Sequence, residues 1–407
     1  MKAVEGTARA PWVLVAGGFH QDGGMDKANA ALASYLAARG TEVEIVSHRV
    51  DDVFRSVRGV HVHIAALPAG SYLLGECALD ALGRRVARRT LFERPNARVV
   101  VNGGNSPWPG INWVHSVHAA WGCNDYGAPV WFRAKNRATK MVARAREREA
   151  MRCARLVITN SNSTREHIIR HLGVDASRVH TVYLGVDSGF CPVANNERAN
   201  ARAALCVPAE RPLVAFVGTL GYDNNKGFDT LLATWIRLCT NSDWDADLIV
   251  AGAGRALERW KRAASDAGVA ARIRFLGFSR QVVDILAAAD LLVSPVRYEA
   301  YGLNVQEAVC RGIPALVSRA AGVSERYTPA LSEMLLQNPE DVKALEAHLL
   351  RWRPHIREWK DRFLPLAREL AKHDWTEMAR QFVEHVEQSG AYDCDAMPPM
   401  PRAEEQA

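Results

Sequence analysis

The chain has 407 residues, 48% of them hydrophobic and 24% charged, a composition typical of a globular protein long enough for two or three domains. The formal net charge of +6 suits anionic ligands but is too small to indicate nucleic-acid binding. No apolar run reaches the ~18 residues that a membrane helix needs, and the N-terminal stretch MKAVEGTARAPW has no apolar signal core, so we expect a cytoplasmic protein.

The 8 cysteines are scattered along the chain, with no C-x-x-C pair and no short cluster of cysteine and histidine. This pattern favours free thiols in a reducing compartment and argues against a structural zinc site.

The first half of the chain alternates between apolar strands and helices. Residues 12–16 have the pattern of a buried strand, a glycine-rich loop follows, and residues 25–39 have helical periodicity that ends at Gly40. Further strands are predicted at residues 42–47, 60–66, 98–102, 112–117, 156–159 and 179–183. Strands that alternate with helices over short links predict a mainly parallel sheet covered on both faces.

The loop after the first strand, GGFHQDGGM, contains Gly17, Gly18, Gly23 and Gly24. Glycines at this position let the backbone approach a phosphate or a sugar closely. The loop lacks the G-x-G-x-x-G spacing of dinucleotide enzymes, and no G-x-x-x-x-G-K-[ST] occurs in the chain. Neither a dehydrogenase nor a P-loop nucleotidase is therefore supported, and a plain tight turn is the alternative interpretation.

Two histidines, His115 and His118, lie three residues apart near the end of a predicted strand. A metal would need a third ligand, and the neighbouring sequence offers none, so we expect no metal site. A buried structural histidine and a polar contact to a ligand both stay open as roles.

Basic residues recur at steps of three and four between residues 133 and 155, and on a helix they would fall within ~100° of arc. They are Arg133, Arg137, Lys140, Arg144, Arg148, Arg152 and Arg155. We expect this basic stripe to face solvent, with Ala138, Val142, Ala145 and Cys153 opposite it, packed on the sheet. A solvated helix face is the plain interpretation; the alternative is attraction of an anionic acceptor or weak peripheral contact with an anionic membrane.

The alternation loosens at residues 190–196, where we place an interdomain linker, and then restarts. Strands are predicted at residues 213–217, 246–251, 273–276, 291–295 and 315–318, and helices between them include residues 228–240 and 281–289. After Pro339 the chain is predicted to be mostly helical, with a mobile tail at residues 391–407.

Two loops after strands of the second half carry candidate ligand contacts. In FVGTLGYDNNKGF, Lys226 precedes Gly227 at a predicted helix start, where a lysine can neutralise a diphosphate as a point charge. In FLGFS, Phe278 follows a strand end; an apolar strand end without a ligand is the alternative there.

Residues 293–318 predict a strand, a turn, a short helix and another strand. The backbone N–H groups of Tyr301, Gly302 and Leu303 are then the unpaired donors of a helix N-terminus, which can bind a phosphate. Glu307 lies ~6 Å further along the helix axis, where its carboxylate can accept hydrogen bonds from vicinal hydroxyls such as those of a ribose. A solvated helix with two surface acids is the alternative interpretation.

With Glu299 and Glu307 separated by seven residues, the stretch RYEAYGLNVQEA resembles the E-x7-E signature of retaining GT-B glycosyltransferases, specifically glycosyltransferase family 4. The resemblance implies an α/β fold of two facing Rossmann-like domains with parallel sheets and an interdomain cleft. We therefore predict an N-terminal acceptor domain at residues 1–190 and a donor domain at residues 191–374, with a last helix at residues 375–390 that crosses back onto the first domain.

The resemblance also implies roles in binding a nucleotide-diphospho-sugar. Glu299 would lie near the donor sugar and Glu307 on the ribose, and His118 would lie over the sugar, with His115 as the second choice. The other candidates at the donor are Gly23, Gly24, Gly218, Thr219, Lys226, Phe278, Arg297, Tyr301, Gly302 and Leu303. Thr219 stands where the family has an arginine, and Arg297 is the candidate to compensate.

The expected function is retaining transfer of a sugar from this donor to an acceptor hydroxyl, without a metal or other cofactor. The family's frequent use of lipid-linked acceptors makes the membrane alternative for the basic stripe worth testing. The rival interpretations are a sugar-nucleotide epimerase or glycosidic phosphorylase on the same fold, and a non-catalytic nucleotide-sugar binder.

Overall fold

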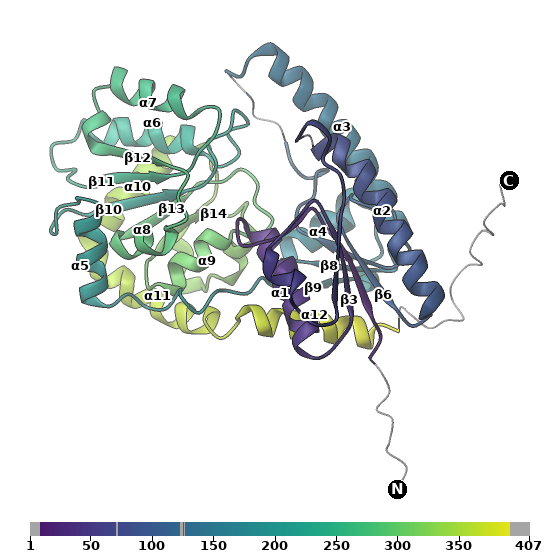
Figure 1. Ribbon diagram of the computed structural model, residues 1–407. Helices are drawn as coiled ribbons and strands as arrows, with labels where there is room; N and C mark the ends of the chain where they lie inside the picture. Colours follow the sequence, from purple (N-terminus) through teal and green to yellow (C-terminus); the bar gives the residue numbers. More distant parts are fainter. Residues whose placement is uncertain (1–8, 71, 123–124, 126, 391–407) are drawn as a thin grey trace, which may run out of the picture.

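The computed structural model describes residues 9–70, 72–122, 125 and 127–390, and the predicted tail at residues 391–407 lies outside them. Two parallel sheets, each covered by helices, form the two ends of the molecule (Figure 1). The predicted α/β architecture with two Rossmann-like sheets is confirmed.

The first sheet has the strand order β5-β3-β1-β6-β7-β8-β9, and each neighbouring pair is parallel. Its central strands are buried along nearly their whole length because helices cover both faces. The strands are β1 (Trp12–Val15), β3 (Val43–Ser47), β5 (Val60–Ile64), β6 (Arg98–Asn102), β7 (Ile111–Val114), β8 (Leu156–Thr159) and β9 (Val179–Thr181). The helices are α1 (Gly24–Ala38), α2 (Tyr72–Glu93), α3 (Val130–Cys153) and α4 (Asn162–Leu172).

The second sheet has the order β12-β11-β10-β13-β14-β15, again parallel throughout. The strands are β10 (Leu213–Val217), β11 (Asp247–Ala251), β12 (Ile273–Gly277), β13 (Leu291–Ser294), β14 (Ala315–Ser318) and β15 (Leu335–Leu336). The helices of this half are α5 (Asn195–Ala204), α6 (Phe228–Leu238), α7 (Leu257–Asp266), α8 (Val282–Ala288), α9 (Leu303–Cys310), α10 (Val342–Trp352) and α11 (Ile356–Leu370).

The last helix, α12 (Trp375–Gln388), lies on the first sheet although it follows the second sheet in the sequence (Figure 1). The ring of Phe382 lies 4.6 Å from the ring of Trp113 and 6.3 Å from that of Trp12, measured between centroids. Burial of these three aromatic rings ties the C-terminal segment to the first half.

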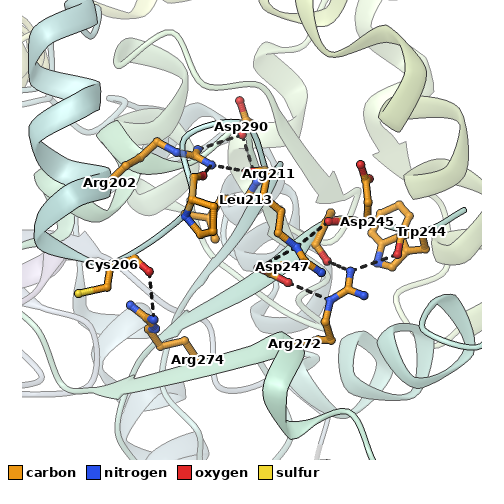
Figure 2. Close-up of polar contacts among 12 residues, drawn as sticks. Arg202, Cys206, Arg211, Leu213, Trp244, Asp245, Asp247, Arg272, Arg274 and Asp290 are labelled. Atoms are coloured by element: carbon orange, nitrogen blue, oxygen red, sulfur yellow. Dashed lines mark hydrogen bonds and ion pairs between the residues drawn. The ribbon is translucent and has the colours of Figure 1, made fainter. Parts of the chain in front are cut away.

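A network of arginines and aspartates holds the amino ends of the second sheet (Figure 2). Asp290 accepts hydrogen bonds from the guanidinium of Arg202 and from the backbone N–H of Leu213, the first residue of β10. Asp247, the first residue of β11, pairs with Arg272 at 2.9 Å and with Arg211 at 3.0 Å. These contacts anchor the amino ends of the strands, and the carboxyl ends, where ligands bind in such sheets, point the other way.

The strands predicted from the sequence match the observed ones to within three residues at each end. Three strands of two residues each were not predicted, because a two-residue strand has no readable periodicity: β2 (Gly18–Phe19), β4 (Arg49–Val50) and β15.

The predicted orientation of α3 is wrong in part: Arg137, Arg148 and Arg152 of the basic stripe are exposed, as predicted, but other cations of the stripe are not. Lys140 of the basic stripe is buried and Arg144 is half-buried, whereas Ala138, Val142 and Ala145, predicted to pack on the sheet, are exposed. Cys153 is exposed as well, and Arg155 follows the end of the helix.

The physical reason is that the inward cations serve backbone carbonyls. Arg144 donates to the carbonyl oxygens of His118 and Trp121, at 3.0 Å each, and Lys140 donates to that of Gly122 at 3.1 Å. The Lys140 ammonium also lies 3.8 Å from the centroid of the Trp121 ring. The helical pattern predicts that charged residues face solvent. It cannot predict that the carbonyl groups of a distant loop accept hydrogen bonds from some of them.

Candidate functional site

A cleft of about 630 Å³ opens between the glycine loop of the first half and the carboxyl ends of the second sheet. Its size is within the usual range for small-molecule sites. Seven residues predicted at the donor line this cleft: Gly23, Gly24, Gly218, Thr219, Phe278, Leu303 and Glu307. Figure 1 shows α1 beside α9, and a Cβ at Gly24 would lie 3.2 Å from the Leu303 side chain, so the two walls of the cleft approach each other closely here.

The N-terminus of α9 faces this cleft. Gly302 caps the helix at φ 107°, a left-handed conformation that only glycine adopts readily. The first N–H groups of the helix have no partner within the helix and favour an anion there. The side chain of Tyr301 plays no part in this, since it is buried and its hydroxyl donates to Gln306.

Glu307 is a buried carboxyl at the floor of the cleft, 8% exposed. Burial raises the pKa of Glu307 to about 7, and the nearby Lys27 lowers it while Asp187 raises it. The Lys27 ammonium lies 3.9 Å from a Glu307 carboxylate oxygen and 2.8 Å from one of Asp187. Asp187 in turn accepts a hydrogen bond from the indole N–H of Trp375 at 2.7 Å. A cation from α1 therefore reaches across the cleft to the acid of α9.

Lys226 is presented at the start of α6 by a backbone that requires glycine. Gly227 has φ 70°, and a Cβ there would lie 1.9 Å from the carbonyl oxygen of Pro295. The Lys226 ammonium pairs with the Glu299 carboxylate, and its stem packs beside Gly218. The structure thus places the Lys226–Glu299 pair beside Gly218 of the cleft wall, although neither residue of the pair lines the cleft itself, and their contacts with the donor stay predictions.

Arg297 lies outside this group. Its guanidinium makes two hydrogen bonds of 2.8 Å to Asp229 and one of 2.9 Å to Glu340, and it also donates to the carbonyl of Asn224. Because two carboxylates already neutralise it, Arg297 is not a spare cation for a phosphate, and the proposed compensation for Thr219 is corrected here.

The two histidines occupy different environments. Both ring nitrogens of His115 are buried without a hydrogen-bond partner in the described chain, its ring lies 4.5 Å from that of Trp113, and burial lowers the pKa of His115 to about 3. His118 is partly exposed, and burial also lowers its pKa, so its imidazole is neutral at pH 7. Both imidazoles are therefore neutral and able to donate and accept, but neither lines the cleft, and a contact of His118 with the sugar stays a prediction.

Sequence reasoning missed several residues around the cleft. Arg280 reaches across its mouth to Asp22, at 3.0 and 3.1 Å, and Arg49 contacts the same carboxylate at 2.7 Å. Lys27 and Asp187 at the floor were missed as well. The sequence signal for Lys27 was its position just after the glycine loop, and that for Asp187 was its position just before the linker; each acts through a partner from a distant segment.

Among the described residues, no group of three or more His, Cys, Asp or Glu side chains is placed to hold a metal ion. Within the same ranges, every helix falls short of the length and apolar character that a membrane crossing requires.

Two sequence models of known families match this chain. The one described as Glycosyltransferase Family 4 matches residues 22–190, and the one described as Glycosyl transferases group 1 matches residues 211–353. A 2-deoxystreptamine N-acetyl-D-glucosaminyltransferase of Streptomyces fradiae is 33% identical over 215 residues, which cover 51% of this chain and 48% of that protein. The match thus spans about half the length of that relative.

Solved structures share the fold. WaaG, a glycosyltransferase involved in lipopolysaccharide biosynthesis, superposes with a TM-score of 0.72 at 19% identity, over 92% of this chain and 99% of that chain. Anabaena HepE, solved in complex with UDP-glucose, superposes with a TM-score of 0.68 at 16% identity, over 93% and 100% of the two chains.

Proposed function

This chain belongs to the family 4 type of GT-B glycosyltransferases, and we propose that it transfers a sugar from a nucleotide-diphospho-sugar to an acceptor hydroxyl. One observation carries the proposal: a single cleft is lined by the first residues of α9 and by the buried Glu307, and the Lys226–Glu299 pair lies behind its lining residue Gly218. The complex of HepE with UDP-glucose supports the class of donor.

In this proposal each group matches one part of the donor. The N–H groups at Gly302 and Leu303 and the ammonium of Lys226 stabilise the negative charge that grows on the diphosphate as the glycosidic bond breaks. Glu307 accepts hydrogen bonds from the ribose hydroxyls. Glu299 and His118 lie on the sugar side.

We propose retention of the anomeric configuration. The acceptor oxygen forms its bond to the anomeric carbon on the face from which the diphosphate leaves, and the acceptor's proton passes to a phosphate oxygen of the leaving group. This route needs no side-chain base and no cofactor besides the donor, and the Glu299 carboxylate is already paired with Lys226.

The test is a thermal-shift screen of the whole chain against nucleoside diphosphates and their sugars, UDP and UDP-glucose first. A ligand at 100 times its Kd should stabilise the protein by ~2.7 kcal/mol. For a donor that binds, NMR of the sugar released by hydrolysis or transfer then gives its anomeric configuration. If no nucleotide sugar binds, the donor proposal is wrong. A product with inverted configuration would be compatible with a glycosyltransferase but would contradict the retaining mechanism.

We also propose a weak peripheral contact between α3 and an anionic membrane, through the exposed part of the predicted basic stripe and the apolar residues beside it. Trp131, Met141 and Val142 of α3 are 56%, 73% and 42% exposed. Exposed cations flank them, namely Lys135, Arg137, Arg148 and Arg152. An exposed helix face that carries apolar and basic side chains together is complementary to anionic lipid.

A further inference from the structure

The loop at residues 115–122, called here the His118 loop, connects β7 to the segment before α3 and contains no helix or strand. A loop without its own backbone ladder takes its conformation from whatever satisfies its N–H and C=O groups. Two separate parts of the molecule do this here.

The first part is α3. The buried carboxylate of Glu147 accepts from the backbone N–H of His118 at 2.8 Å and from that of Ala119 at 3.0 Å. Arg144, one turn earlier, donates to the carbonyl oxygens of His118 and Trp121. Both backbone groups of His118 are therefore fixed by side chains of one helix.

The second part comes from the other half of the chain. The hydroxyl of Tyr298 accepts from the backbone N–H of Val117 at 2.7 Å, and Tyr298 is buried. Tyr298 immediately precedes Glu299. On the other side of Glu299, the carbonyl of Ala300 accepts from the hydroxyls of Ser161 and Thr164, at 2.6 and 3.0 Å. The turn that carries Glu299 is thus held by first-half residues on both sides.

From these contacts we propose that Glu147 and Tyr298 are positioning residues for His118. Glu147 fixes the backbone of the His118 loop on α3, and the Tyr298 hydroxyl aligns that loop with Glu299, so that His118 is in place only when the two halves are closed on each other. The inference rests on the proposed function, because it assigns His118 a contact with the donor sugar.

The chain offers matched controls for both residues. Tyr327 is a buried tyrosine whose hydroxyl donates to the carbonyl of Ala315 at 2.8 Å, a contact confined to the second half. Glu149 is an exposed acid on α3, two residues from Glu147. Tyr298→Phe and Tyr327→Phe each delete one buried hydroxyl, and Glu147→Gln and Glu149→Gln each delete one charge.

The first measurement is amide hydrogen exchange of the full chain, which needs no activity. Tyr298→Phe leaves the Val117 N–H without its acceptor, so exchange in residues 117–119 should become about tenfold faster, the scale of one lost hydrogen bond. Glu147→Gln should accelerate the same amides, because an amide side chain cannot accept from both N–H groups. Tyr327→Phe and Glu149→Gln should leave them unchanged. Unchanged exchange in Tyr298→Phe overturns the inference.

The second measurement is a double-mutant cycle on donor turnover. Tyr298→Phe should lower kcat about tenfold with the Kd for the nucleoside diphosphate unchanged. In a His118→Ala background the same substitution should have no further effect, because a residue that acts through His118 has nothing left to position. Additive effects would show that Tyr298 acts independently of His118 and would overturn the inference. A wild-type chain that turns over no nucleotide sugar would remove the proposed function instead, while the exchange result would still decide whether Tyr298 orders the loop.

Discussion

At the scale of single residues, Glu307 is the most sensitive indicator of the site, because it is a carboxyl buried beside its partners. Burial raises the pKa of Glu307 to about 7, so between about pH 4.5 and 7 the folded state binds more protons at this group than the unfolded state does. The stability contributed by this group is therefore largest at low pH and falls as the pH rises through that window.

Glu307→Gln removes this dependence. We expect the variant to gain thermal stability relative to the wild type as the pH rises from about 4.5 to 7, with a constant difference above that range. Scanning calorimetry at several pH values measures this difference, and a difference that does not vary with pH would contradict the buried ionisation. Nucleotide affinity should follow the opposite course: wild-type binding improves as Glu307 ionises, and comparison with Glu307→Gln cancels the titration of the nucleotide itself.

Lys226 is predicted to act on the departing diphosphate. Lys226→Ala should lower kcat by about a hundredfold, the usual effect of losing one preorganised charge stabiliser, and should leave binding of the neutral nucleoside nearly unchanged. Kinetics with the nucleotide sugar, compared with calorimetry of the nucleoside, separate the two effects. An equal loss for both ligands would point to a damaged fold at Gly227 and not to lost charge.

At the scale of elements, strands and site residues differed in how far the sequence could predict them. Each strand of three or more residues in the two sheets is an apolar run between turn residues, so its position could be predicted from the local pattern alone. The glycine loop, Leu303 and Glu307 lie together in one cleft because they are at strand ends and helix starts, which parallel topology brings to one edge.

Residues whose role depends on a distant partner could not be predicted this way. Lys27 meets Asp187 and Glu307 across the cleft, and Lys140 meets a carbonyl of the His118 loop. For Arg297 the opposite holds. Its neighbours in the sequence predicted a contact with the phosphates of the donor, but in the structure it pairs with Asp229 and Glu340.

The structural role of Arg297 gives a prediction of its own. Arg297→Ala should lower the free energy of unfolding by about 2 kcal/mol, because it removes charged hydrogen bonds that join the turn after β13 to the start of α6. The stabilisation produced by a saturating nucleotide should stay the same, and Arg152→Ala, at an exposed arginine of α3, serves as the control for both quantities. Denaturant titration with and without nucleotide measures them. Weakened nucleotide binding in a normally stable variant would return Arg297 to the site.

At the scale of the whole molecule, ion pairs between side chains of the two halves bridge the cleft. Arg280 with Asp22 spans its mouth, and Lys27 with Glu307 spans its floor. Between them the walls touch at Gly24 and Leu303. We expect a donor bound among these contacts to couple nucleotide binding to the relative position of the two halves.

The exposed face of α3, in contrast, is not covered by the rest of the described chain, and Trp131 and Met141 stay exposed on it. We expect the full chain to sediment with liposomes of anionic lipid at low salt and to be released as salt rises, because the flanking cations contribute about 1 kcal/mol each near the lipid surface and are screened by ions. Trp131→Ser with Met141→Ser should weaken binding at every salt concentration, since it removes the apolar contact and keeps the charges. Lys343→Ser, far along the chain on α10, serves as the charge-removing control. Equal and negligible sedimentation with neutral and anionic vesicles would end the membrane proposal and leave an acceptor that reaches the cleft from solution.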